Sequence, residues 1–300
     1  MSKKDEEEIE ELEEEEEVKP SHKGLINFII ILIILIVGLI FYSKYVGTKG
    51  LIVKEYRVES NILSENFSGI KIVHFSDLYY KSTFEKDDLV ALVDKINILK
   101  PDIVVFTGDL VPPTVKLNDE DINILNENLS KIEAKIGKYA IYGDNDYKLN
   151  NYEEIMTTSG FTILSNSYEE IFYKTNESIY IVGLPSSIKE KSDLNKAFEF
   201  YKDDNRKYVI TLVHDGKTIK SIDDSNYEVD LILGGHSLGG LIQIPFYGGL
   251  IKDSSMYKYS EEYYKKGITN IYISSGLGTN EYDFRLNNKP SFNLYRLKAL

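Results

Sequence analysis

Residues 25–42 read LINFIIILIILIVGLIFY and contain no charged side chain. As a helix with about 1.5 Å of rise per residue, this stretch is roughly 27 Å long, close to the hydrocarbon thickness of a bilayer. A buried core helix would rarely be apolar on every side. No small-residue cleavage motif follows, as it would after a secretory signal peptide. The stretch therefore predicts an uncleaved, single-pass transmembrane anchor.

The segments on either side of this anchor differ in composition. Residues 1–24 hold ten glutamates in an acidic block, and blocks of like charge repel themselves. We expect a disordered tail there, which is either a docking segment for a partner or a solvated segment without one. Residues 43–50 form a linker, and residues 51–300 form the folded domain. Lysines flank both ends of the anchor, so charge leaves its orientation undecided.

Net charge and cysteine content exclude some classes of function. The formal net charge is −13, so the chain lacks the basic footprint of a nucleic-acid-binding protein, and we expect no nucleic-acid partner. The sequence contains no cysteine. This excludes a disulfide, a thiolate metal ligand and a cysteine nucleophile.

Apolar runs and helical periodicities alternate along the first part of the folded domain. Apolar residues recur at a period of 3.6 in two predicted helices, at 89–99 and 120–135. They separate predicted strands at 69–77, 101–109 and 138–146, after a first strand at 51–58. This order argues for parallel pairing. From residue 162 only one helix is expected, near 192–203, among strands at 207–215, 228–236, 268–278 and 291–299, which suggests mixed pairing.

Five predicted strands end in residues that bind metals in proteins: Asp77, Asp109, Asp144, His214 and His236. Ligands of open α/β sheets bind at the carboxyl ends of strands, so all five side chains could converge on one crevice. A strand-end Asp taken alone is more often a turn former. Three carboxylates held close together, however, need a compensating charge. With two imidazoles they form a ligand set suited to Mn, Fe or Zn.

These strand-end motifs, in this order, resemble the calcineurin-like metallophosphoesterase family. That family reads D-x-H, G-D, G-N-H-[DE], H and G-H-x-H. The corresponding stretches here are SDLYY, TGDLV, YGDNDY, LVHDG and GGHSLGG. The resemblance runs from about Gly69 to the C-terminus and looks like the membrane-anchored branch of the family. It implies an α/β fold, a four-layer α/β/β/α sandwich with two mixed β-sheets, and a domain outside the cytoplasmic membrane.

The resemblance also implies metal ligands, and three residues depart from the family pattern. The metal A positions hold Asp77, Tyr79, Asp109 and Leu238, so a phenol and an alkyl chain replace two imidazoles. The metal B positions hold Asp109, Asp144, His214 and His236, a complete set if Asp144 replaces the family's Asn. A one-residue slip would instead make Asn145 the ligand. In either case no His occupies GDND, and Asn145, at the family's His position, cannot shuttle a proton.

Two functional interpretations follow. The first is a membrane-anchored phosphoesterase that binds one divalent Mn, Fe or Zn ion, with Asp77 as a weak ligand. Its substrate would be a phosphomonoester or phosphodiester, including a lipid head group. The second is a catalytically degenerate relative that acts as a binding or scaffold module. The complete metal B set favours the first. Tyr79, Asn145 and Leu238 favour the second, because the two-metal clamp and the proton donor are lost.

Overall fold

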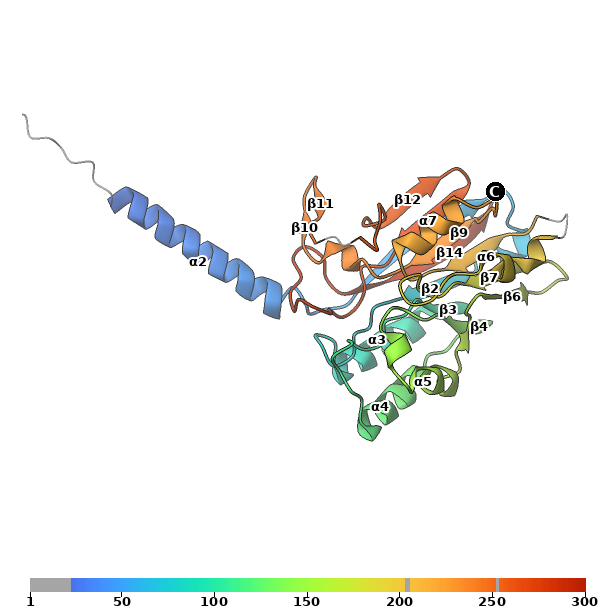
Figure 1. Cartoon of the computed structure of the whole chain (residues 1–300), viewed down its shortest axis with the longest axis horizontal. Coiled ribbons are helices and arrows are strands. Elements are labelled where there is room, and N and C mark those ends of the chain that lie inside the picture. Colours follow the sequence, from blue (N-terminus) through green and yellow to red (C-terminus); the bar gives the residue numbers. More distant parts are fainter. Residues whose placement is uncertain (1–22, 203–205, 252–253) are drawn as a thin grey trace, which may run out of the picture. The chain divides into compact units, whose positions relative to one another are not determined.

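The computed structural model describes residues 23–202, 206–251 and 254–300. The chain divides into two compact units, of which the first ends at Phe41 and the second spans Tyr42–Leu300. The predicted acidic tail lies, apart from its last two residues, outside the described residues. Helix α2 (Lys23–Tyr45) contains the predicted anchor (Figure 1). Its length and composition suffice to cross a membrane, and its apolar side chains are exposed.

The second unit contains two six-stranded mixed sheets. In the first sheet, the order is β1-β14-β2-β3-β4-β5. The last four of these run parallel, whereas β14 is antiparallel to β2 and parallel to β1. The strands are β1 (Ile52–Ser60), β2 (Lys71–Phe75), β3 (Ile103–Phe106), β4 (Gly137–Ala140), β5 (Thr162–Ile163) and β14 (Ser291–Ala299).

The second sheet has the order β12-β13-β9-β8-β7-β6. Its four central strands run parallel and its two edge strands are antiparallel to their neighbours, so the expected mixed pairing is confirmed. The strands are β6 (Ser167–Phe172), β7 (Ser178–Gly183), β8 (Val209–Leu212), β9 (Leu231–Gly234), β12 (Tyr263–Lys266) and β13 (Thr269–Ile273). A separate hairpin joins β10 (Gln243–Ile244) and β11 (Gly248–Gly249).

Three apolar clusters show how the layers stack. One fills the space between the sheets and includes Ile72 and Leu212. Neighbouring side chains point the opposite way, as the alternation of a strand requires, so Val73 and Val213 belong to the outer clusters. Helices α3 (Lys86–Leu99), α4 (Asp119–Leu129) and α5 (Tyr152–Thr158) cover the first sheet, and α6 (Leu194–Ala197) and α7 (Gly216–Asp223) cover the second. The predicted α/β/β/α sandwich is confirmed (Figure 1).

The second half of the domain differs in detail from the expectation. The helix expected near 192–203 divides into α6 and a 3₁₀ turn, Glu199–Lys202. A further helix, α7, connects β8 to β9, where the sequence pattern indicated none. Its eight residues are too few for a clear helical periodicity. The side chain of Asp215 caps α7 by accepting a hydrogen bond from the backbone N–H of Thr218.

The predicted linker, residues 43–50, contacts the domain. Ser43, Gly47 and Thr48 are buried. The backbone N–H of Arg285 donates to the carbonyl O of Ser43 at 2.9 Å. A Cβ on Gly47 would lie 1.8 Å from the carbonyl O of Arg285, so this close approach of two backbones requires glycine. Within the second unit, Ser43 is thereby attached to the segment that leads into β14.

Candidate metal centre

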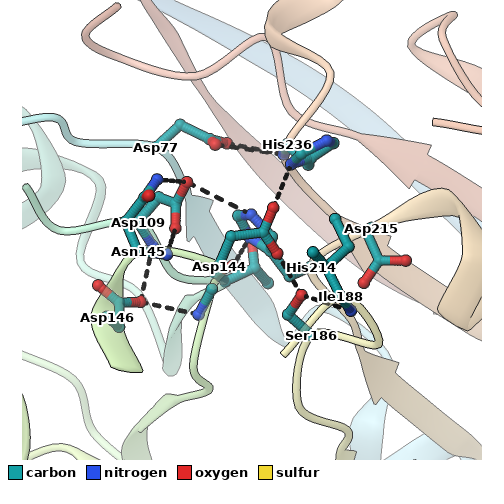
Figure 2. A network of polar contacts seen from close by, with 12 residues as sticks. Asp77, Asp109, Asp144, Asn145, Asp146, Ser186, Ile188, His214, Asp215 and His236 are labelled. Carbon is teal, nitrogen blue, oxygen red and sulfur yellow. Dashed lines mark hydrogen bonds and ion pairs between the residues drawn. The ribbon is translucent and has the colours of Figure 1, made fainter. Parts of the chain in front are cut away.

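Loops at the carboxyl ends of five strands hold the predicted ligands. Asp77 follows β2, Asp109 follows β3 and Asp144 follows β4, all in the first sheet. His214 follows β8 and His236 follows β9, both in the second sheet. Figure 2 shows their side chains gathered in one region of the domain. The structure therefore brings together all five residues that the strand-end pattern singled out.

The ligand atoms of these residues form two overlapping groups. In one, atoms of Asp144, His214 and His236 all lie within 4.8 Å of one another, and in the other the same holds for Asp77, Asp109 and His214. Nε2 of His214 is 3.5 Å from Oδ2 of Asp109, and Nδ1 of His236 is 3.2 Å from Oδ2 of Asp144. His214 belongs to both groups, so it is the centre of the cluster.

The surroundings of His214 fit a bound cation. Its Nδ1 lies 2.7 Å from the carbonyl O of Thr107. A carbonyl only accepts, so Nδ1 carries a proton and Nε2 is the atom left to bind a metal. Nε2 is buried, makes no hydrogen bond with the described residues and faces the Asp109 carboxylate. Burial lowers the pKa of His214, but the charges of Asp109, Asp144 and Asp77 outweigh it and raise that pKa well above its ordinary value. The three carboxylates therefore favour a positive charge at this position.

The Asp109 carboxylate is held by two side chains at departed family positions. The hydroxyl of Tyr79 donates to Oδ2 at 2.6 Å, and the amide Nδ2 of Asn145 donates to the same oxygen at 2.7 Å. The backbone N–H of Asn145 donates to Oδ1 at 2.9 Å. Burial alone would raise the pKa of Asp109, but the charge of His214 and these hydrogen bonds lower it below its usual value. Asp109 is therefore an ionised carboxylate.

Asp144, rather than Asn145, points its side chain into the cluster with the two imidazoles. Its Oδ1 accepts a hydrogen bond from the hydroxyl of Ser186, and its Oδ2 faces His236. Burial opposes ionisation of Asp144, yet the hydrogen bond to His236 and the charge of His214 lower its pKa. Asn145 was the alternative ligand. Its side-chain amide donates a hydrogen bond to Asp109 instead.

The loop after β9 needs glycine at position 235, because its backbone passes close to Ser76 and Asp77. A Cβ on Gly235 would lie 2.0 Å from Oγ of Ser76 and 2.7 Å from Oδ2 of Asp77. The backbone N–H of His236 donates to both carboxylate oxygens of Asp77, at 3.2 and 3.0 Å. Burial raises the pKa of Asp77, and the charge of His214 opposes this effect. Asp77 thus supports the His236 loop in addition to belonging to the second ligand group.

The remaining metal A positions form an apolar patch. Tyr79 and Leu238 are buried together with Leu241, and Ile251 and Phe284 pack against them. Burial, followed by the charges of Asp109 and Asp77, raises the pKa of Tyr79 well above its ordinary value, so its phenol is neutral. A neutral phenol that already donates to Asp109 and an alkyl chain are poor ligands for a cation.

The cluster opens at Asp144 and His236, whose side chains are 13% and 12% exposed. A cavity of about 160 Å³ lies next to this opening. His236, Leu241, Met256 and Tyr282 are among the residues that line it. The cluster is therefore accessible from the side of His236, whereas Asp77, Asp109 and His214 are closed off from solvent.

Sequence reasoning did not single out Asp146, the last residue of GDND. Its buried carboxylate accepts backbone N–H groups of Asp109, Leu110 and Gly143 at 2.7 to 2.9 Å. It therefore joins the loops after β3 and β4. Burial and the charge of Asp109 raise the pKa of Asp146 to about 7. The sequence signal for this role is the acid that closes the family pattern G-N-H-[DE], the position that Asp146 occupies. Ser186 and Ser255, which hydrogen bond to Asp144 and His236, had none.

The sequence profile of the calcineurin-like phosphoesterase family matches residues 70–240, which include all five clustered residues. The chain belongs to this family. It is also 33% identical over 263 residues to the metallophosphoesterase YkuE of Bacillus subtilis, an alignment that covers 86% of this chain and 89% of that one. Membership in this family supports the interpretation of the cluster as a metal-dependent phosphoesterase site.

Two more distant relatives have informative names. A transmembrane protein with a metallophosphoesterase domain from Danio rerio is 25% identical over 72% of this chain, which spans half of that protein's length. The UDP-2,3-diacylglucosamine pyrophosphatase LpxG of Chlamydia muridarum is 25% identical over 59% of this chain and 66% of its own.

Proposed function

We propose that the chain is a single-pass phosphoesterase of the cell membrane that binds one divalent Mn, Fe or Zn ion through Asp109, Asp144, His214 and His236. Its substrate is a phosphomonoester or phosphodiester at the bilayer, including a lipid head group. The observation that carries the proposal is the meeting of two imidazoles and two carboxylates around His214. The name of the LpxG relative and the apolar length of α2 support a lipid substrate at a membrane.

Different side chains of such a site bind the cation, orient its ligands and keep Asp109 ionised. When bound, a divalent cation supplies charge that stabilises the negative charge developing on a phosphate ester. Thr107 orients the ring of His214, and Ser186 orients Asp144. Tyr79 and Asn145 keep Asp109 ionised through their hydrogen bonds. Ligation that depends on such neighbours is typical of metal sites, because they fix the orientation of each ligand.

Metal analysis of the full-length protein tests the proposal. The protein is purified in detergent without chelator, loaded with manganese or zinc, and desalted. We expect one equivalent per chain, lost in His214→Ala and in His236→Ala. His74→Gln is the matched control, because His74 is buried elsewhere and bonded to Thr107 and Tyr295. The loaded protein should hydrolyse an aryl phosphodiester, and both alanine variants should not.

Two other outcomes would change the assignment. Two tight equivalents would show that Asp77, Asp109 and His214 hold a second cation, and a two-metal mechanism would replace the proposed one. No bound metal would overturn the phosphoesterase proposal and leave the crevice as a binding module.

A further inference from the structure

The hairpin of β10 and β11, residues 243–250, exposes an apolar surface. Its sequence, QIPFYGGL, contains no charged residue. Phe246 is fully exposed, Tyr247 is 67% exposed, and Ile244 and Leu250 are also exposed. The hairpin belongs to neither large sheet and stands out from them in Figure 1. Single exposed apolar residues are ordinary, but four within eight residues form a patch of the kind that marks an interaction surface.

The tip of this hairpin has an aromatic residue, Phe246, in a strained backbone conformation. The backbone N–H of Tyr247 donates to the carbonyl O of Ile244 at 3.0 Å, which closes a β-turn. Pro245 is at the second position and Phe246, with a φ of 67°, is at the third. A turn with proline second and a positive φ third normally has glycine at that third position. Phe246 occupies that position with its ring exposed, and a strained, exposed aromatic residue motivates the hypothesis of an external contact.

Within the second unit, backbone hydrogen bonds connect the hairpin base to Ser43. The N–H of Gln243 donates to the carbonyl O of Leu286 at 2.9 Å. The N–H of Leu286 donates to the carbonyl O of Leu241 at 3.1 Å. The preceding residue, Arg285, donates its N–H to Ser43 at 2.9 Å. Ser43 directly follows the predicted membrane anchor. If the anchor spans a bilayer, the hairpin base is therefore held near its surface.

We propose that the hairpin tip, residues 244–247, inserts into the interfacial region of the same bilayer that α2 spans, and this rests on the proposed membrane anchorage. At about 3.3 Å per residue, Phe246 lies at most roughly 10 Å from Gln243. The interfacial region on each side of the hydrocarbon core is roughly 5 to 7 Å thick, so this reach is sufficient. Tyrosine favours that region, and phenylalanine is buried at its boundary with the acyl chains. The anchor also keeps the hairpin at a high effective concentration beside lipid.

Such docking would act on the metal centre, because one segment of chain connects the two. Residues 236–251 run from the ligand His236 through the hairpin and back. Gly240, Leu241 and Ile251 flank the hairpin and line the cavity beside His236. A docked hairpin would hold this cavity close to the bilayer surface, where the phosphates of lipids are presented.

The test uses the absence of tryptophan from the sequence. Phe246→Trp places the only tryptophan of the full-length protein at the tip. The protein is reconstituted in vesicles of phosphatidylcholine with or without bromine on the acyl chains, and the tryptophan emission is recorded. Leu35→Trp reports on α2, and Phe172→Trp is the matched control, since Phe172 is an exposed aromatic residue on the edge strand β6. We expect bromine to reduce the emission of Phe246→Trp and Leu35→Trp several-fold more than that of Phe172→Trp.

Each failure has its own signature. If bromine leaves Leu35→Trp unquenched, the membrane anchorage is wrong and the docking with it. If Leu35→Trp is quenched but Phe246→Trp behaves like Phe172→Trp, the docking alone is wrong, and a protein partner becomes the better occupant of the hairpin.

A second variant separates docking from folding. Phe246→Gly removes the ring and relieves the positive-φ strain, so the thermal unfolding midpoint should not fall. Combined with Tyr247→Trp as the reporter, Phe246→Gly should lower quenching by brominated lipid compared with Tyr247→Trp alone. Equal quenching with and without Phe246 would show that its ring makes no contact with the bilayer.

Discussion

At the scale of single residues, one oxygen atom distinguishes this site from its family pattern. Oδ2 of Asp109 accepts hydrogen bonds from Tyr79 and Asn145, both of which stand where the family has histidine. The same oxygen faces Nε2 of His214 at 3.5 Å. Protein hydrogen-bond donors therefore occupy lone pairs that a second cation would otherwise share, which is why we propose a single metal.

Restoring the family residues should therefore increase turnover. The triple change Tyr79→His, Asn145→His and Leu238→His returns two imidazole ligands and one proton donor. Loss of one interaction that stabilises the transition state typically costs about 10²–10³ in rate, so we expect at least about a 10²-fold rise in hydrolysis of an aryl phosphodiester. The same three positions changed to alanine form the control. An unchanged rate would mean that the departures extend beyond these positions.

Asp146 should be essential to the geometry of the centre. Asp146→Ala leaves three buried N–H groups without an acceptor, and each such group costs about 1–3 kcal/mol. We expect a loss of about 3 kcal/mol or more in the free energy of unfolding by urea, together with weaker metal binding, because the loop of Asp109 is released. Asp146→Asn, which retains one acceptor oxygen, should lose less. A full-stability alanine variant would contradict this role.

At the scale of elements, strand β2 places a neutral histidine between the two sheets. His74 is fully buried beside Thr107 and Tyr295, 2.8 and 3.4 Å from their hydroxyl oxygens. Burial lowers the pKa of His74 to about 3. The unfolded chain, with an ordinary histidine pKa near 6.5, binds a proton that the folded state excludes. The stability contributed by neutral His74 is therefore complete above about pH 6.5 and declines as the pH falls towards 3.

This linkage predicts a pH-dependent contribution that can be removed. Between those limits, each pH unit costs up to about 1.4 kcal/mol of unfolding free energy. His74→Gln retains a side chain able to hydrogen bond with Thr107 but does not titrate. Urea unfolding at pH 7 and pH 5 should show a smaller stability loss for His74→Gln than for the parent protein. Parallel losses in the two proteins would rule out His74 as the titrating group.

For the whole molecule, the family resemblance predicts on which side of the membrane the domain lies. We expect the domain outside the cytoplasm. An alkaline phosphatase fused after Leu300 should then be active, whereas a fluorescent protein that matures only in the cytoplasm should be dark at the same position. The opposite pair of results would place the domain in the cytoplasm and restrict its substrates to that side.

Features that depend on local pattern could be predicted from the sequence alone. An uncharged run of 18 residues predicts a membrane helix from length and hydrophobicity alone. Continuous apolar runs indicate buried strands, and the carboxyl ends of such strands converge in an α/β fold. The sequence therefore predicts that five side chains meet at one end of the domain: Asp77, Asp109, Asp144, His214 and His236.

The orientation of those residues, and the groups that support them, depend on the tertiary structure. The choice between Asp144 and Asn145 depends on where each side chain points, and the roles of Asp146, Ser186 and Ser255 depend on partners far away in the sequence. The connection of Ser43 to the hairpin through Arg285 and Leu286 has the same origin. Periodicity reports which face of an element is buried, but contacts between loops are set by how whole sheets pack, because that packing brings distant backbone groups within hydrogen-bonding distance.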